Sequence, residues 1–218
     1  MLSYTEENYL KTIYHLSESE SKEVSTNAIA EAVSTKPASV SDMLKKLAQK
    51  SLIDYVKYQG VTLTEEGRVK ALKIIRKHRL WEVFLVNKLN FNWDEVHDVA
   101  EELEHIKSPL LIKRLDDFLG YPAFDPHGDP IPSEDGIINH KVCVPLNTLT
   151  IGAVGVIVGL NETASTFLKF LDKIGVYIGV KVKVLDKSAF DHSFEIEIDQ
   201  KTILMISNEV AKNLNVSE

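Results

Sequence analysis

The feature that most constrains the fold is a change in the spacing of apolar residues near residue 52. Before this point, three short segments carry apolar residues at helical spacing. The third segment has four of them on one helical face: Val40, Met43, Leu44 and Leu47. After it, residues 52–56 and 61–63 follow the period of about two that is typical of strands. Three helices followed by a hairpin within about 65 residues predict a winged helix-turn-helix.

The starts of these helices carry recognisable capping residues. Ser3 and Glu6 form an S-x-x-E capping pattern, and either Ser25 or Thr26 can cap the second helix. Pro37 suits the first turn of the third helix. The local signals therefore agree with the hydrophobic pattern.

Further helices follow the hairpin, and the chain then changes character. Thr64 caps a helix that is expected to run to about Lys88, and two more are expected at 94–106 and 109–119. Residues 121–140 are rich in Pro, Gly and Asp and are interpreted as a loop or linker. Beyond them we expect a small barrel-like domain. Its main elements are a helix within 162–174 and strands at 180–184 and 194–198.

Charge and composition narrow the class of protein. The net charge is −7, but residues 36–80 carry +7 and residues 81–140 carry −9, which suits contacts to phosphates with one part and to a cation with another. The polar N-terminus is unlike a signal peptide, and no apolar run approaches the roughly 20 residues of a membrane helix. Because Cys143 is the single cysteine, no intrachain disulfide can form, and we expect a cytoplasmic protein.

The third helix is the candidate DNA-reading element. Its start would meet base edges in the major groove, which makes Ala38, Ser39 and Asp42 the candidates for base readout. Phosphate contacts are expected from four lysines: Lys36, Lys45, Lys46 and Lys57. The alternative is a small helical domain with solvated lysines, because winged helices also mediate protein contacts.

A second cluster suggests metal binding. Residues 94–105 contain six carboxylates and no Lys or Arg, whereas ordinary solvated helices pair their charges. On a helical wheel, four potential ligands fall on one face: His97, Glu101, Glu104 and His105. The preceding helix adds His78 and Glu82 one turn apart. Imidazole and carboxylate without thiolate suit Mn²⁺, Fe²⁺, Ni²⁺ or Zn²⁺, and the excess of oxygen favours Mn²⁺. The alternative is a solvated acidic face.

The chain resembles the diphtheria-toxin-repressor family, including its manganese-transport-regulator branch. The resemblance rests on motifs in order along nearly the whole chain: residues 5–14, 37–41, 76–80, 96–105 and 128–132. The tail from Pro145 to Gly179 resembles the SH3-like domain shared with ferrous iron transport protein A.

The resemblance implies a mostly α chain with a β-rich C-terminal part. Its expected segments are a winged helix-turn-helix DNA-binding domain (1–63), a helical metal-binding and dimerisation domain (64–120), a linker (121–141) and an SH3-like domain (142–218).

The resemblance also implies two metal sites per subunit. The ancillary site would use His78, Glu82 and His97. The primary site would use Asn8, Glu101, Glu104 and His105. Asn8 replaces the Asp of the manganese branch, and Lys11 stands where that branch has a Glu. The family's SH3-like domain can supply ligands too, but Glu162 is interpreted as solvated.

These expectations combine into one functional prediction. The chain would be a repressor that binds palindromic operator DNA as a homodimer when Mn²⁺ or Fe²⁺ activates it, and so controls metal homeostasis. Neither a membrane nor a small organic substrate is expected as a partner. A metal-independent winged-helix regulator whose tail binds a protein or peptide is the alternative. We do not expect an enzyme, because the sequence shows neither an H-E-x-x-H motif nor a nucleophile elbow.

Overall fold

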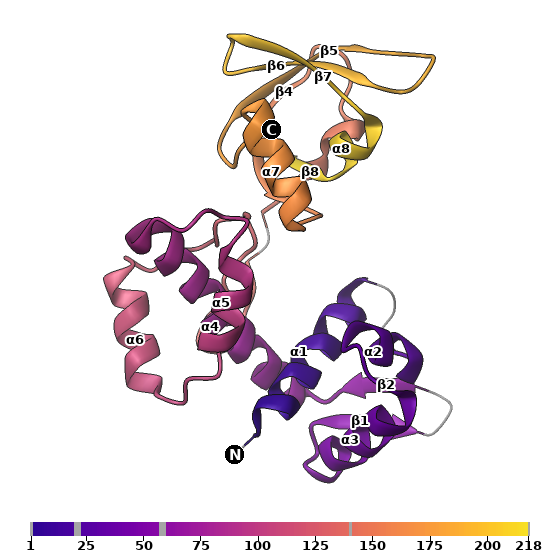
Figure 1. The fold of residues 1–218 in the computed structure, drawn as a ribbon, viewed down its shortest axis with the longest axis vertical. Coiled ribbons are helices and arrows are strands. Elements are labelled where there is room, and N and C mark those ends of the chain that lie inside the picture. The colour runs from indigo at the N-terminus through magenta and orange to yellow at the C-terminus, as the bar shows by residue number, and fades with distance from the viewer. Residues whose placement is uncertain (1, 20–22, 57–59, 140, 218) are drawn as a thin grey trace. The chain divides into compact units, whose positions relative to one another are not determined.

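The computed structural model describes residues 2–19, 23–56, 60–139 and 141–217, which form two compact units (Figure 1). The first unit comprises Met1–His78, Glu101–Ile112 and Pro132–Ile138. The second comprises Arg79–Ala100, Lys113–Ile131 and Asn139–Glu218. No helix in the described part of the chain is both long and apolar enough to span a membrane.

The first unit contains the predicted winged helix-turn-helix. Its elements are α1 (Tyr4–Ser19), α2 (Thr26–Ala32), α3 (Pro37–Gln49), β1 (Ile53–Val56), β2 (Gly60–Leu63) and the start of α4 (Glu65–Leu89). The Ser3–Glu6 capping box forms as expected, and the cap of α2 is Ser25, whose hydroxyl accepts from the Ala28 amide. The hairpin strands pair antiparallel, and Val24 adds a bridge to Val61.

One apolar core holds these helices against the hairpin. Val40, Leu44 and Leu47 of α3 are fully buried there, and Met43 packs at its edge. Leu10 and Ile13 of α1 are fully buried in the same core. This packing confirms the predicted inner face of α3 and leaves its opposite face in solvent.

The next two helices are α5 (Val96–Leu103) and α6 (Pro109–Phe118). The predicted helix 94–106 is therefore too long at both ends. At its start, the Asn92 amide donates to Glu95 Oε2 at 3.3 Å before the first helical residue, Val96. After Leu103 the chain closes a single turn, in which the Ile106 amide donates to the Leu103 carbonyl at 3.1 Å.

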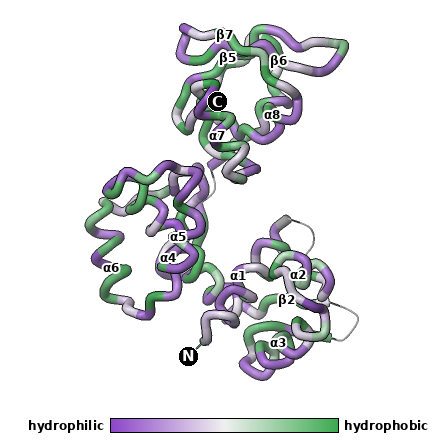
Figure 2. Tube along the Cα trace, viewed as in Figure 1, coloured by the Kyte–Doolittle hydropathy of each residue, from purple (hydrophilic) through white to green (hydrophobic). Residues whose placement is uncertain are grey.

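The C-terminal part, in the second unit, is an antiparallel sheet with strand order β3-β8-β4-β5-β6-β7. The elements of this part are β3 (Val144–Pro145), η1 (Leu146–Thr148), β4 (Val154–Leu160), α7 (Ser165–Ile174), β5 (Lys181–Lys187), β6 (Phe194–Ile198), β7 (Thr202–Ile206), α8 (Asn208–Lys212) and β8 (Leu214–Ser217). Hydrophobic and hydrophilic residues alternate along β5 and β6 (Figure 2), and Val182 and Val184 of β5 are buried. At Gly155 a Cβ would lie 2.3 Å from Val216 Cγ1, which explains the glycine where β4 meets β8.

Candidate metal centre

In the first unit, a buried lysine of α1, Lys11, contacts two carboxylates of the segment 101–105. The Lys11 ammonium donates to Glu101 Oε1 at 3.0 Å and to Glu104 Oε2 at 2.9 Å, and it lies 2.8 Å from Glu104 Oε1. The Glu104 side chain is fully buried, and that of Lys11 is only 11% exposed. The predicted primary ligands Glu101 and Glu104 are therefore brought together, with a protein cation between them.

The two histidines of this region also have carboxylate partners. His78 Nδ1 lies 2.7 Å from Glu104 Oε2, and His105 Nδ1 lies 2.6 Å from Glu7 Oε2. An ionised carboxylate only accepts hydrogen bonds, so Nδ1 of His105 carries the proton and its Nε2 points toward Glu104 Oε1 at 3.5 Å. Glu7 was missed in the sequence because its partner is 98 residues away.

The electrostatics of Glu104 reflect these partners. Burial alone would raise the pKa of this carboxyl, but the hydrogen bond from His78 and the Lys11 ammonium lower it below its ordinary value. Two buried polar atoms nearby, Asn8 Oδ1 and His105 Nε2, have no hydrogen-bond partner within the described chain, and Glu104 Oε1 is in ionic contact with the Lys11 ammonium. These atoms suit a divalent cation, but the ammonium already shares the two carboxylates, so a metal ion fits here only in competition with Lys11.

The prediction that four ligands lie on one face of a single helix is wrong in one respect. Because α5 ends at Leu103, Glu104 and His105 are not on its helical surface. His97 is 62% exposed, and its Nδ1 lies 3.9 Å from Glu82 Oε1. His97 thus pairs with Glu82 in the second unit, whereas the carboxylates that follow it face Lys11 in the first.

The second unit holds a buried cluster that the sequence analysis did not predict. One ligand atom each from Glu82, Asp125 and His127 lie within 4.8 Å of one another, and all three residues are buried. His127 Nδ1 is 3.8 Å from Glu82 Oε1. His127 Nε2 lies 2.8 Å from the carbonyl oxygen of Trp93, to which it must donate. In the neutral ring the lone pair of Nδ1 therefore faces Glu82 Oε1, as a metal-ligating histidine requires.

A tight turn supplies two of these three side chains. Asp125 Oδ1 accepts from the amides of His127 at 2.8 Å and Asp129 at 2.9 Å. Gly128 has φ +89°, and a Cβ there would lie 2.1 Å from the Val158 carbonyl oxygen. The turn can therefore close only with glycine at this position.

Negative charge is in excess in this cluster. Burial raises the pKa of Asp125, and the neighbouring carboxylates of Asp129 and Glu82 raise it further, whereas Arg79 lowers it. Arg79 Nε lies 3.5 Å from Asp125 Oδ2, and its guanidinium also lies 3.2 Å from Asp129. The donor atoms of Glu82, Asp125 and His127, two carboxylates and an imidazole, fit a divalent cation.

Trp93 links this cluster to the C-terminal domain. Its ring stacks with that of His127 at a centroid distance of 6.2 Å, and its Nε1 donates to Asp172 Oδ2 of α7 at 3.0 Å. The next residue, Asp94, accepts from Ser165 at 3.0 Å. Glu162 is exposed and accepts from the Ala164 amide at 2.7 Å.

The predicted DNA contacts lie on the solvent face of α3 and at its start. All of the predicted residues within the described chain are exposed: Lys36, Ala38, Ser39, Asp42, Lys45 and Lys46. Lys45 pairs with Asp42 at 3.0 Å, so part of this charge is already matched. Lys57 lies outside the described residues.

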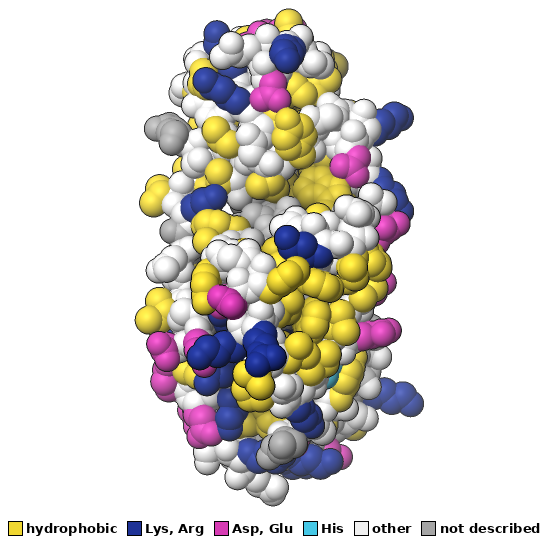
Figure 3. Space-filling view, turned by 90° about the vertical axis from the view of Figure 1, so that its left-hand side faces the viewer, with side chains coloured by type: hydrophobic (Ala, Val, Ile, Leu, Met, Phe, Trp, Pro, Cys, Tyr) yellow, Lys and Arg dark blue, Asp and Glu magenta, His cyan; other side chains and the backbone are white. Residues whose placement is uncertain are grey.

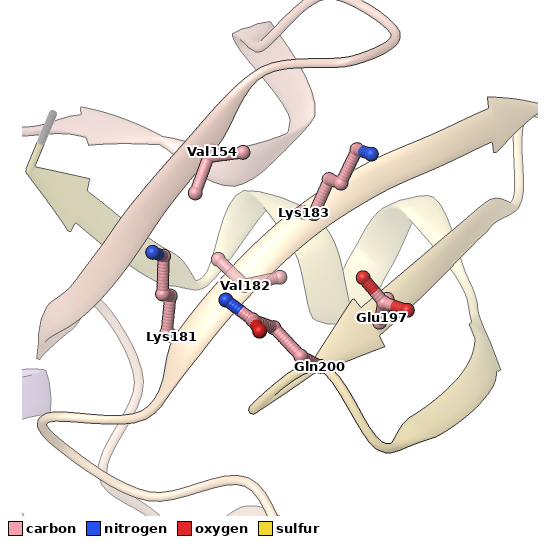
Figure 4. A pocket seen from close by; sticks show the side chains of 6 residues that line it. All are labelled: Val154, Lys181, Val182, Lys183, Glu197 and Gln200. Atoms are coloured by element: carbon pink, nitrogen blue, oxygen red, sulfur yellow. The ribbon is translucent and has the colours of Figure 1, made fainter.

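A hollow of about 380 Å³ on the C-terminal sheet offers a different kind of surface (Figure 4). Its lining residues are Val154, Lys181, Val182, Lys183, Glu197 and Gln200. The lining holds no hydroxyl or thiol nucleophile and no histidine.

Known proteins resemble this chain along its whole length. Residues 1–61 match "Iron dependent repressor, N-terminal DNA binding domain", residues 64–133 match "Iron dependent repressor, metal binding and dimerisation domain" and residues 144–218 match "FeoA domain". These matches confirm the predicted fold class.

Individual relatives agree with these matches. Diphtheria toxin repressor of Corynebacterium diphtheriae is 30% identical over 194 residues, which cover 84% of this chain and 85% of that protein. Iron-dependent repressor IdeR of Mycobacterium tuberculosis is 37% identical over 128 residues, which cover 59% of this chain; the match spans about half of that relative, 55%.

A solved structure described as a manganese-dependent transcriptional repressor in complex with manganese superposes with a TM-score of 0.85. It is 35% identical and covers 97% of this chain and 98% of that one.

Proposed function

The chain belongs to the iron-dependent repressor family of metal-dependent transcriptional regulators, and on that premise we propose that it represses transcription by binding palindromic operator DNA as a homodimer when Mn²⁺ or Fe²⁺ is bound. The observation that carries this proposal is the buried, negatively charged cluster of Glu82, Asp125 and His127 on the same chain as a winged helix.

We propose that the tight metal site is built on Glu82, Asp125 and His127. The hydrogen bond from His127 to Trp93 fixes the ring tautomer, and the amides of the turn orient Asp125. Two carboxylates and an imidazole without sulfur suit Mn²⁺ or Fe²⁺.

We propose that the sites implied by the family resemblance bind metal more weakly than this tight site. The ancillary set is His78, Glu82 and His97, of which Glu82 and His97 lie together in the second unit. The primary set is Asn8, Glu101, Glu104 and His105, grouped around Lys11. Since Glu82 belongs to the tight site as well, its substitution affects more than one set.

DNA binding is proposed for α3. Ala38, Ser39 and Asp42 would read base edges, and Lys36, Lys45, Lys46 and Lys57 would contact phosphates. Two observations support this role: the named residues of α3 are exposed, and the opposite, apolar face of the helix is buried in the core. Two such helices in a twofold dimer would lie about 34 Å apart, one turn of DNA.

The proposed dimer contact is on α6. Leu110 is 60% exposed, Phe118 at the other end of the helix is 62% exposed, and Tyr121, which follows the helix, is 67% exposed. Hydrophobic side chains gather on the face of the molecule shown in Figure 3. An exposed apolar patch of this kind supports an interface, and the family match names this segment a dimerisation domain.

The proposed switch follows from the elements that carry the three metal ligands. Glu82 is on α4, whereas Asp125 and His127 are on the loop after α6. Drawing these side chains together restrains the loop, and we propose that the restrained arrangement binds DNA better than the loose one. A full switch from 1% to 99% requires about 10⁴-fold differential affinity, which two subunits would share.

Selection of DNA from a random duplex pool tests this function. The protein is expected to enrich a palindromic sequence in excess Mn²⁺ and to lose it in excess chelator. Asp125→Ala should abolish the enrichment, whereas Asp135→Asn, at an exposed site in the following segment, should not alter it. Equal enrichment with metal and with chelator would favour the metal-independent regulator instead.

The family descriptions name DNA-binding, metal-binding and dimerisation domains, and no catalytic domain is among them. A metal-dependent hydrolase therefore has no support from these matches.

A further inference from the structure

The most unusual group in the first unit is the ammonium of Lys11, which lies between two carboxylates of the predicted primary metal site. It is within 3.0 Å of Glu101 and 2.8 Å of Glu104, and its side chain is almost fully buried. Long lysine side chains normally extend to water, so a buried lysine held by two carboxylates is a specific arrangement.

We propose that Lys11 is a tethered cation that takes the place of one of two metal ions. Given the proposed function, each subunit then binds one ion tightly, at Glu82, Asp125 and His127, and not two. One of the two negative charges at Glu101 and Glu104 is neutralised permanently by the chain itself. Control of DNA binding by metal therefore belongs to the other site.

The surroundings of Lys11 support this role. The ammonium offers three donors, and Glu101 and Glu104 accept two of them directly. Asn8 presents a neutral amide where a metal site of this kind gains from a carboxylate, so the cluster has one negative charge less to attract a divalent ion. Lys77 is a second cation whose charge acts on Glu7 and Glu104.

The same geometry predicts what removal of the ammonium would create. Asn8 Oδ1 and His105 Nε2 are buried without hydrogen-bond partners in the described chain, and removal of the ammonium would free Glu104 Oε1. Together with Glu101 they offer an amide oxygen, two carboxylates and an imidazole nitrogen. This donor set suits Mn²⁺ once no fixed positive charge competes for the carboxylates.

The test is the number of tightly bound Mn²⁺ ions per subunit, measured by equilibrium dialysis and calorimetry. Wild type should bind one ion tightly, and Lys11→Met should bind two. At the second site the affinity for Mn²⁺ should be roughly 100-fold higher than in wild type, because the repulsion between ammonium and metal is lost. Lys11→Arg keeps the charge and should still bind one. Lys70→Met breaks an exposed Lys–Glu pair on α4 and should also bind one.

Stability provides a second readout. Lys11→Met leaves the buried carboxylate of Glu104 without the Lys11 cation, so it should melt at a lower temperature than wild type in chelator and recover most of that loss in Mn²⁺. Lys11→Gln provides a second neutral variant should Lys11→Met fail to fold.

Two tight ions in wild type, or one ion in both neutral Lys11 variants, would overturn the role of Lys11. The double variant Lys11→Met with Asp125→Ala should retain one ion, at the new site. Wild type without any tightly bound ion would instead refute the proposed function.

Discussion

Gly128→Ala tests the turn that positions the unpredicted ligands. At this residue φ is +89°, and the added Cβ would lie 2.1 Å from the Val158 carbonyl oxygen and 2.6 Å from Gly159 Cα. Reaching an ordinary contact of 3.4 Å requires the two backbone segments to move apart by about 1.3 Å. The strained φ alone costs about 1–2 kcal/mol, and the displacement raises the total to about 3 kcal/mol or more.

The displaced turn carries Asp125 and His127, so metal binding should weaken as well. A shift of about 1 Å in groups that orient metal ligands lowers affinity roughly 10–100-fold. Gly152→Ala is the matched control, because Gly152 has φ +88° and nothing within 4 Å of an added Cβ. Both variants are compared by calorimetric titration with Mn²⁺ and by thermal melting. Both share the strained φ, whereas the backbone is displaced only in Gly128→Ala, so the comparison separates the two effects. Wild-type Mn²⁺ affinity in Gly128→Ala would refute the argument that this turn builds the site.

Three further predictions concern other parts of the chain. Leu44→Ala should destabilise the winged helix by about 2–5 kcal/mol in denaturant unfolding, because Leu44 is fully buried in its core; a loss under 1 kcal/mol would contradict that packing. Glu104→Gln should lower stability by about 3–5 kcal/mol, since it leaves buried Lys11 without its full partner, while Asp125→Ala measured alongside should lose metal affinity instead. Hydrogen bonds from Ser188 and Ser193 lower the pKa of Asp191 to about 2, so an NMR titration should find its carboxylate ionised until the pH approaches that value. Because the native pKa lies below the unfolded value of about 3.9, this contribution to stability is present above pH 4 and is lost as the pH falls toward 2.

The sequence predicted the helices and strands well where local signals were strong. Apolar spacing identified the buried face of α3, and the capping pattern at Ser3 and Glu6 marked the start of α1. The end of α5 was misjudged because Glu104 and His105 continue the helical pattern in the sequence, while Lys11, the partner of Glu104, lies 93 residues away. Such a long-range ion pair leaves no local signal.

The candidate site was predicted only in part for the same physical reason. His97 and Glu82 were recognised from helical spacing, and they do lie close together. Asp125 and His127 lie in a segment rich in Pro and Gly, which reads as a linker because loops have no periodicity. Their chemical role is visible only after the turn at Gly128 folds them toward Glu82.

The central claim is that metal occupancy controls DNA binding. Its most direct test is the affinity for the selected palindrome, measured with Mn²⁺, Fe²⁺, Co²⁺ and Zn²⁺ and with chelator at one fixed salt concentration. We predict weak binding in chelator, tight binding in Mn²⁺ or Fe²⁺, and no response to either metal in Asp125→Ala. Equal affinity with metal and with chelator would contradict the claim.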